Sequence, residues 1–300
     1  MFEIYDAHMH CEVNGGIPEE QIEKMREIGV FGGAVMSPEP ESPVEPGFSY
    51  EERMAALEKW TSLAPDKFHK VLWIHPLEKD PIAKMRDAVD RGVKGFKMIC
   101  DCYYPAGLEN MPLLEEAVRL NKPVIFHSGI SWTGKDSSKY NRPLNWEPLV
   151  ELEGIRFSLA HCSWPWHDET IALYGKFLNA TASNPNGPEM FVDTTPGTPK
   201  IYRKDLLFKL YNCCYDLPHN IMFGVDCTIN NYNAPWTKQW VDYDTELMDE
   251  IGVGKHLQRM YFHDNFLRFI GETPKDFTHV KPVPDDPGAF SLEYANKYLK

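Results

Sequence analysis

The residues best suited to chemistry in this sequence are histidines and acids at the ends of short apolar runs. They are Asp6, His8 and His10 in D-A-H-M-H, His127 in PVIFH, His161 in FSLAH, and Asp226 in IMFGVD. Residues two apart in an extended chain point the same way, so His8 and His10 can present two imidazoles to one ion. Neutral imidazole and carboxylate groups suit Zn²⁺, Mn²⁺ or Fe²⁺.

Each of these residues also has an ordinary structural interpretation. An H-x-H pair can lie on the surface, a single strand histidine can be satisfied inside a core, and Asp226 can cap a following helix. Their joint placement at strand ends favours a shared metal site. Three histidines and one aspartate, with a position left for water, would form a catalytic metal site. The metal ion would lower the pKa of that water toward neutrality.

Eight short apolar runs alternate with amphipathic stretches, and they are the elements that must position these side chains. We expect strands at Glu3–Asp6, Phe31–Met36, Lys70–Ile74, Val93–Ile99, Val124–Phe126, Arg156–Ala160, Met190–Asp193 and Ile221–Val225. We expect helices at Pro18–Ile28, Tyr50–Leu63, Pro81–Arg91, Met111–Leu120, Trp146–Leu152, His167–Leu178, Asp205–Tyr211 and Tyr243–Ile251. Eight such units predict an α/β fold, a (β/α)₈ TIM barrel whose strand ends meet at one rim.

The sequence favours a single domain, and its composition argues against some classes of binding partner. Residues 1–300 are interpreted as one barrel domain with a C-terminal extension from about residue 272, in which Ser291–Leu299 is expected to form a helix. The net charge of −13 argues against nucleic acid and anionic membranes as partners. With neither an apolar leader nor a paired C-x-x-C motif, we expect a cytoplasmic protein with free thiols.

The order of the motifs resembles that of a known family. D-A-H-M-H, G-F-K-M, H-S-G, A-H-C, V-D-T-T, F-G-V-D and N-F-L-R-F-I-G follow one another from about Tyr5 to Gly271. This pattern is similar to the amidohydrolase superfamily, in the branch that contains aminocarboxymuconate-semialdehyde decarboxylase and 2-pyrone-4,6-dicarboxylate lactonase. The resemblance implies a metal-dependent barrel in which His8, His10, His127 and Asp226 bind one metal ion, with Asp226 and His161 as catalytic residues.

One motif departs from the pattern of this branch, and one lysine leaves the number of bound metal ions open. The final motif reads G-V-D-C-T where branch members usually have G-S-D-x-P. Lys97 ends the fourth strand, and other amidohydrolases carboxylate a lysine there to bridge two metals. The branch resemblance favours a single ion, preferably zinc, with manganese or iron as alternatives. Cys11, Cys162 and Cys227 each follow a motif residue and are expected to pack against helices as small apolar groups.

Long loops after the strands are rich in aromatic residues, which suit a flat substrate. We predict Lys97, Trp132, Arg142 and Trp164 as substrate-binding residues, with Lys135 and Arg203 as further candidate cations for a substrate carboxylate. The predicted function is metal-dependent hydrolysis of a small cyclic or carboxylated lactone, ester or amide. A non-oxidative decarboxylase and a catalytically silent metal-binding barrel are the alternatives. The expected partner is a small molecule, and the chain can also form a homo-oligomer.

Overall fold

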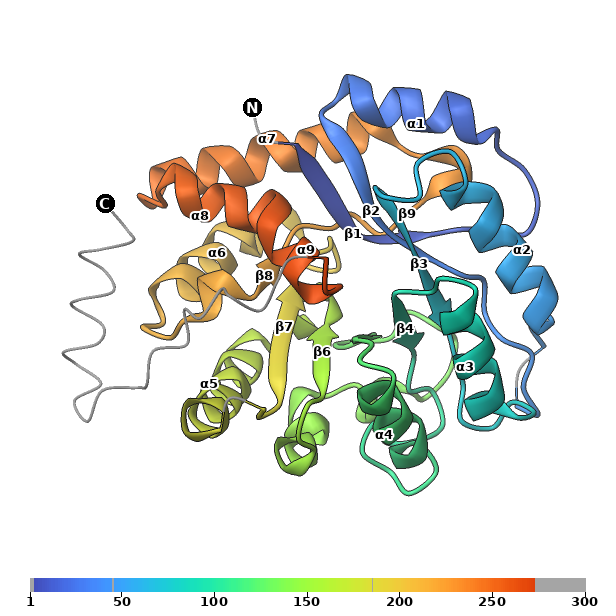
Figure 1. Ribbon diagram of the computed structural model, residues 1–300. Helices are drawn as coiled ribbons and strands as arrows, with labels where there is room; N and C mark the ends of the chain where they lie inside the picture. Colours follow the sequence, from blue (N-terminus) through green and yellow to red (C-terminus); the bar gives the residue numbers. More distant parts are fainter. Residues whose placement is uncertain (1–2, 45, 185, 273–300) are drawn as a thin grey trace.

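The computed structural model describes residues 3–44, 46–184 and 186–272, and its centre is one curled parallel sheet. Figure 1 shows helices arranged around this sheet. The strands are β1 (Ile4–His10), β2 (Val30–Met36), β3 (Phe68–Trp73), β4 (Gly95–Met98), β5 (Val124–Phe126), β6 (Arg156–Leu159), β7 (Glu189–Asp193), β8 (Ile221–Met222) and β9 (Cys227–Thr228). Neighbours along the chain are neighbours in the sheet, in the order β8 to β1 followed by β9.

The two shortest strands close the sheet into a barrel. β8 pairs with β7, whereas β9 pairs with β1. Only the segment Phe223–Asp226 separates them, and the backbone N–H of Ala7 donates to the carbonyl of Phe223 at 2.9 Å. β8 and β9 are therefore two halves of one eighth strand. The predicted (β/α)₈ barrel is confirmed, although its eighth strand is interrupted where Ile221–Val225 was expected to run continuously.

The helices form the outer layer and begin at recognisable signals. They are α1 (Pro18–Glu27), α2 (Tyr50–Thr61), α3 (Pro81–Asp90), α4 (Met111–Arg119), α5 (His167–Ser183), α6 (Arg203–Asn212), α7 (Ala234–Glu250), α8 (Lys255–Arg259) and α9 (Asn265–Phe269). Ser49 caps α2 through a capping box with Glu52, which satisfies amides that have no partner inside the helix.

Two of the predicted helices differ from those observed. The segment expected as a helix at Trp146–Leu152 is a 3₁₀ helix over Pro143–Glu151, with Pro148 inside it. A proline has no N–H to donate and clashes with the preceding turn, so a regular α-helix is disfavoured there. The helix expected at Tyr243–Ile251 begins much earlier, at Ala234, because the Asn233 side chain caps it. The extension after residue 272 and its expected helix at Ser291–Leu299 lie outside the described residues.

Apolar side chains fill two separate regions. The larger region lies between the strands and the surrounding helices. The smaller one is inside the barrel, where Tyr5, Ala34, Val71 and their neighbours meet Phe266 and Phe269 of the α9 segment. Figure 1 shows α9 lying across the end of the strands. This helix therefore plugs the lower end of the barrel, where the strands begin, and leaves the end where they finish for polar groups.

A change of register in β1 turns both of its histidines toward the interior. Ala7 belongs to the interior apolar cluster, whereas Met9 packs in the outer layer. Pairing with β2 shifts between Asp6 and Met9, so the usual alternation is broken and His8 and His10 both line the same interior cavity. The Asp6 carboxylate accepts from the backbone N–H groups of His8 and Val225, which fixes this irregular turn.

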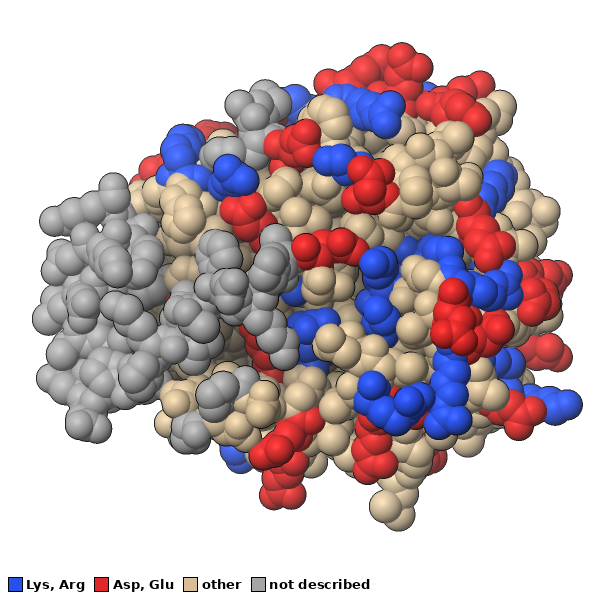
Figure 2. Space-filling model, viewed as in Figure 1, with Lys and Arg blue, Asp and Glu red and all other residues tan. Residues whose placement is uncertain are grey.

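Charged groups of both signs are mixed over the face shown in Figure 2. Surface ion pairs among the described residues include Lys238 with Asp242 and Lys209 with Asp168. Among the described helices, none is long and apolar enough to cross a membrane.

Candidate metal centre

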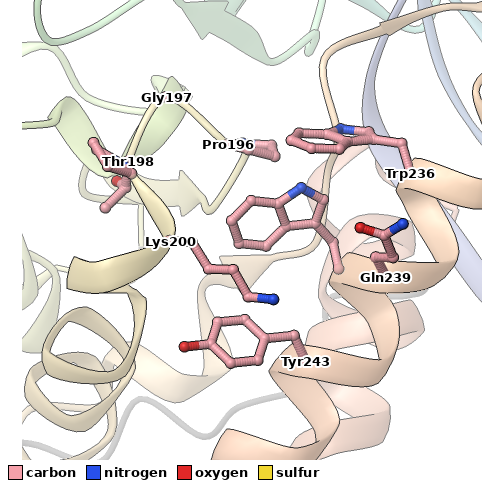
Figure 3. A pocket seen from close by; sticks show the side chains of 9 residues that line it. Pro196, Gly197, Thr198, Lys200, Trp236, Gln239 and Tyr243 are labelled. Atoms are coloured by element: carbon pink, nitrogen blue, oxygen red, sulfur yellow. The ribbon is translucent and has the colours of Figure 1, made fainter.

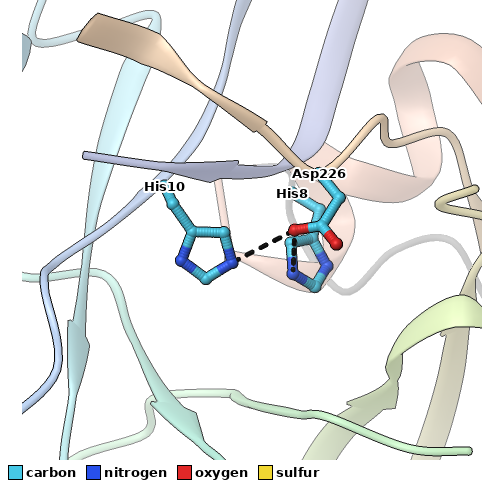
Figure 4. A group of neighbouring side chains, drawn as sticks. All are labelled: His8, His10 and Asp226. Atoms are coloured by element: carbon cyan, nitrogen blue, oxygen red, sulfur yellow. Dashed lines mark ion pairs between the residues drawn. The ribbon is translucent and has the colours of Figure 1, made fainter. Parts of the chain in front are cut away.

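Three side chains that lie far apart in the sequence converge at the upper end of the barrel. His8 Nε2 lies 3.6 Å from Asp226 Oδ1, and His10 Nε2 lies 3.3 Å from the same oxygen. Figure 4 shows both imidazoles directed at this carboxylate. One donor atom from each of the three residues can be chosen so that all lie within 4.8 Å of one another. The arrangement brings together three of the four predicted ligands.

The backbone conformation of Asp226 turns its side chain into this position. Its φ of 59° is left-handed, a region that non-glycine residues seldom adopt. The residue follows the interruption between β8 and β9, and its N–H donates to the carbonyl of His8 at 2.9 Å. Burial alone would raise the pKa of the Asp226 carboxyl, but His8, His10 and His161 hold it below its usual range. Asp226 is therefore an anion facing imidazoles.

The orientation of the His8 ring is set by Asp193. His8 Nδ1 lies 3.1 Å from Asp193 Oδ2, and both side chains are buried. Nearby His8 keeps the pKa of Asp193 below normal despite burial, so the carboxylate accepts the Nδ1–H and leaves Nε2 available to a ligand. Sequence reasoning placed Asp193 at the end of the seventh strand and assigned it no role. The signal was the same as for the histidines, an ionisable group directly after an apolar run.

A hydrogen-bonded chain also defines the tautomer of His161. The Thr195 hydroxyl lies 2.5 Å from Asp193 Oδ1, an acceptor, and 2.7 Å from His161 Nδ1. Because the hydroxyl donates its one proton to the carboxylate, His161 Nδ1 must donate to the hydroxyl oxygen. The remaining nitrogen, Nε2, lies 4.0 Å from Asp226 Oδ2. Burial, with His8 nearby, lowers the pKa of His161 to about 4, so its ring is neutral at pH 7.

His127 lies beside this group without belonging to the trio. Its ring centroid is 5.0 Å from that of His161, and it lines the same cavity. Burial, with His161 nearby, holds the pKa of His127 far below normal. Its Nε2 is buried and has no hydrogen-bond partner among the described residues. A neutral nitrogen with no partner, on a side chain that lines the cavity, suits a metal or ligand contact.

Lys97 lies at the floor of the same site. Its Nζ is 3.4 Å from His8 Nε2, and the side chain is 1% exposed. Burial lowers the pKa of this ammonium to about 8. Most of this side chain is therefore a cation at pH 7, which suits contact with a substrate oxygen, and a minor neutral fraction is present, as carboxylation would require.

These groups surround a cavity of about 370 Å³ that opens at the upper rim. Trp132 and Trp164 stack with an interplanar angle of 4° at its entrance. Lys97, Trp132 and Trp164 therefore line this cavity, and their role in substrate binding stays a prediction. Arg142 does not line the cavity, because it pairs with Glu169 at 3.0 Å on the surface.

The other predicted cations also lie outside this cavity. Lys135 pairs with Asp101 at 3.3 Å. Arg203 is fully buried against Asp244 at 2.7 Å, where it holds α6 to α7. These three arginine and lysine side chains stabilise loops and helices around the site.

The cysteines follow the packing expectation. All seven are free thiols, and Cys11 and Cys162 are buried in the outer apolar layer, with Cys227 packed against it. Burial raises the pKa of the Cys11 thiol to about 12, and these groups behave as small apolar side chains.

The donor set fits a divalent metal ion. It combines two imidazole nitrogens, one carboxylate and an adjacent unpartnered imidazole, and Asp193 supplies the outer hydrogen bond that metal-binding histidines usually make. His8, His10 and Asp226 would hold the ion, with His127 beside it.

The chain belongs to the amidohydrolase family Amidohydro_2, whose sequence profile matches residues 5–271. Members of this family are enzymes of the metal-dependent hydrolase type, and the present site has the residues for that chemistry. None of the curated protein sequences matches the chain.

Solved structures share the fold at low sequence identity. A probable 2-pyrone-4,6-dicarboxylic acid hydrolase from Acinetobacter baumannii, crystallised with citric acid, has a TM-score of 0.61 and 13% identity, covering 90% of this chain and 99% of its own. Dihydroorotase from Campylobacter jejuni has a TM-score of 0.59 and 14% identity, covering 92% and 85%. An amidohydrolase from Burkholderia multivorans with bound zinc has a TM-score of 0.59 and 9% identity, covering 89% and 99%.

Proposed function

We propose that this protein hydrolyses a small cyclic lactone, ester or amide that carries a carboxylate, using one divalent metal ion. The observation that carries the proposal is the convergence of His8, His10 and Asp226, with the unpartnered nitrogen of His127 beside them. Zinc is the preferred metal, because imidazole and carboxylate donors suit it and a structurally similar amidohydrolase binds it.

A metal ion bound here would supply Lewis acidity and lower the pKa of water. The protein's own part begins with Asp226, which is anionic and lies at the centre of the site. Its carboxylate accepts a proton from the attacking water and returns it to the leaving group, acting first as a base and then as an acid.

His161 and Lys97 are placed to interact with the reacting carbonyl. The hydrogen bonds through Thr195 leave the Nε2 lone pair of His161 facing the cavity, 4.0 Å from Asp226. In this tautomer His161 orients the attacking water by accepting a hydrogen bond from it at Nε2, while Asp226 alone takes and returns the proton. Lys97, at the floor, is the cation nearest to a substrate oxygen bound there.

The cavity walls support a flat substrate. Trp132 and Trp164 form parallel planes at the entrance, and Ile99 and Ile130 add apolar surface below them. The resemblance to a 2-pyrone-4,6-dicarboxylic acid hydrolase with bound citrate supports a carboxylated ligand. Ring planes of this kind favour cyclic substrates over flexible ones.

Metal content and turnover of two Asp226 variants test this proposal. Elemental analysis of the wild type should give about one Zn per chain, and Asp226→Ala should lose much of it, because one of three converging donors is removed. Asp226→Asn should fold normally and lower kcat on a panel of carboxylated lactones and esters about 10²–10⁴-fold, because the amide cannot accept the proton.

Asp242→Asn is the matched control, because that carboxylate pairs with Lys238 on the surface of α7. An active Asp226→Asn variant would refute the assigned role. Carbon dioxide release from the carboxylated substrates without hydrolysis would refute the hydrolase function and support a decarboxylase. Two metal ions per chain and a mass increase of one CO₂ on Lys97 would refute the single-metal centre. They would support a two-metal centre bridged by carboxylated Lys97.

A further inference from the structure

A second pocket lies directly beside the catalytic cavity, and the helix on one side of it contributes three aromatic residues. It encloses about 240 Å³ between the loop after β7 and helix α7. Trp236, Trp240 and Tyr243 of α7 line it at intervals of four and three residues, so all three lie on one face of the helix. Figure 3 shows Trp236 and Tyr243 turned toward the loop that carries Pro196 and Lys200.

One cation, Lys200, lines this pocket, and it has no acidic partner within the described part of the chain. Lys200 Nζ lies 4.3 Å from the centroid of the Tyr243 ring. Nearby lysines form ion pairs, Lys204 with Glu250 and Lys209 with Asp168, whereas among the described residues no carboxylate lies within ion-pair distance of Lys200. An ammonium held over an aromatic ring, with its remaining donors open, is suited to bind an anion.

The pocket and the catalytic cavity share a wall. Pro196 and Gly197 line both of them. The backbone at Gly197 is so close to the reacting centre that a Cβ added there would lie 3.1 Å from Cβ of His161. A single stretch of backbone therefore separates the aromatic pocket from a predicted catalytic residue.

The catalytic cavity lacks a cation for a remote carboxylate. Among the described residues that line it, Lys97 is the only lysine or arginine, and it lies at the floor against His8. Arg142, the cation expected at the entrance, is engaged by Glu169. The nearest chamber with an available cation is the aromatic pocket, through Lys200.

We propose that this pocket binds an aromatic carboxylate, the part of the substrate remote from the bond that is broken. The ring packs against Trp236 and Trp240, and its carboxylate pairs with Lys200. This inference rests on the proposed hydrolase function for the reaction itself, whereas the pocket's ligand follows from its own residues. The substrate class becomes an ester, lactone or amide linked to a ring that bears an anion.

Calorimetric titration with 2-naphthoate and its neutral counterpart 2-naphthamide tests the pocket. The wild type should bind 2-naphthoate more tightly than 2-naphthamide. Lys200→Met, which keeps the apolar stem, should weaken 2-naphthoate binding about three- to tenfold and leave 2-naphthamide unchanged, because only the charged contact is lost. Trp236→Ala should weaken both ligands, and Lys204→Met is the control for loss of a nearby charge.

Further variants separate this pocket from the metal centre. His10→Ala should bind 2-naphthoate like the wild type even if it hydrolyses nothing. No binding by the wild type, or wild-type affinity in both Lys200→Met and Trp236→Ala, would overturn the proposal. Loss of 2-naphthoate binding in His10→Ala alone would show that the carboxylate occupies the metal centre instead.

Hydrolysis of 2-naphthyl acetate and 6-acetoxy-2-naphthoate tests the link to catalysis, because both carry the same reacting ester. Lys200→Met should lower kcat/KM about three- to tenfold for the carboxylated ester only. Equal effects on both esters would overturn the role of the pocket as a substrate subsite. Failure of the wild type to cleave either ester would count against the proposed hydrolase function, while calorimetry would still decide what the pocket binds.

Discussion

The two ends of the barrel interior are filled by opposite kinds of side chain, although the same strands supply both. At the upper end, His8 and His10 follow one another along β1 and meet Asp226. At the lower end, Tyr5 of the same strand stacks on Phe266 at 5.7 Å, and Phe191 contacts Phe269. The apolar lower end holds the strands together, so the upper end can hold polar groups that add little to stability.

Two buried histidines, one at each end of the barrel, differ in their hydrogen bonding. His8 at the upper end donates to Asp193, which leaves its second nitrogen directed at the site. His69, the second residue of β3, lies at the lower end with its ring centroid 5.8 Å from that of Phe266. Neither of its nitrogens has a hydrogen-bond partner among the described residues. Burial of a histidine therefore does not by itself indicate function. An acidic residue that orients the ring is the more informative sign.

The largest effect on stability should come from breaking the plug. Phe269→Ala removes a fully buried ring that contacts Phe191 and should lower the free energy of unfolding by about 3–5 kcal/mol, because it leaves a cavity that the barrel cannot close. Urea denaturation measures this change. The metal content of the folded fraction should stay that of the wild type, since the plug lies at the opposite end.

Phe208→Ala is the matched control, because that ring is 53% exposed on α6 and should change stability little. If the two variants lost stability equally, the lower cluster would not be the region that holds the barrel together.

The unpartnered histidine of the lower end should make stability depend on pH. Burial lowers the pKa of His69 to about 4, below its value of about 6.5 in the unfolded chain. The unfolded state therefore binds the proton more readily, and stability is lost as the pH falls from about 6.5 to about 4. The loss from this residue should be about 3 kcal/mol at most.

Comparison with His69→Leu isolates this contribution. The stability difference between wild type and variant, measured by urea denaturation at pH 7 and again near pH 4, should shift in favour of the variant at the lower pH. Carboxyl groups titrate alike in both proteins and cancel. A stability difference that does not change with pH would show that the pKa of His69 is not lowered in the folded protein.

The smallest expected effect concerns the orienting carboxylate of the upper end. Asp193→Asn leaves the shape of the side chain nearly unchanged but removes the charged acceptor of the His8 Nδ1–H. Zinc affinity, measured by competition with a chelator, should fall about 10–100-fold. Asp168→Asn on the surface is the control, and unchanged zinc affinity in Asp193→Asn would mean that the ring is held by packing alone.

The parts that could be predicted from sequence depend on short-range patterns. Strand ends are marked where an apolar run meets an ionisable residue, and this located His8, His10, His161 and Asp226 at one rim. The same pattern was present at Asp193, but its role depends on which histidine lies across the barrel. That relation is set by closure of the sheet and is invisible along the chain.

The loop cations could not be predicted in the same way. Arg142 and Lys200 both follow strands in proline-containing loops, and no periodicity indicates where such a loop leads. Arg142 pairs with Glu169 on α5, whereas Lys200 has no ion-pair partner among the residues that the structure describes and lies over Tyr243. Only the packing of distant helices against the loops decides which cation faces a pocket.

The interrupted eighth strand has a consequence for the order of events during synthesis. His8 and His10 are made long before Asp226, which lies in the segment that joins β8 to β9 and connects β7 to β1 in the sheet. A nascent chain that has not yet exposed Asp226 outside the ribosome carries two imidazoles without their third donor. Because domains generally fold as units as synthesis proceeds, the assembled site should become able to retain an ion only when the last strand docks beside the first.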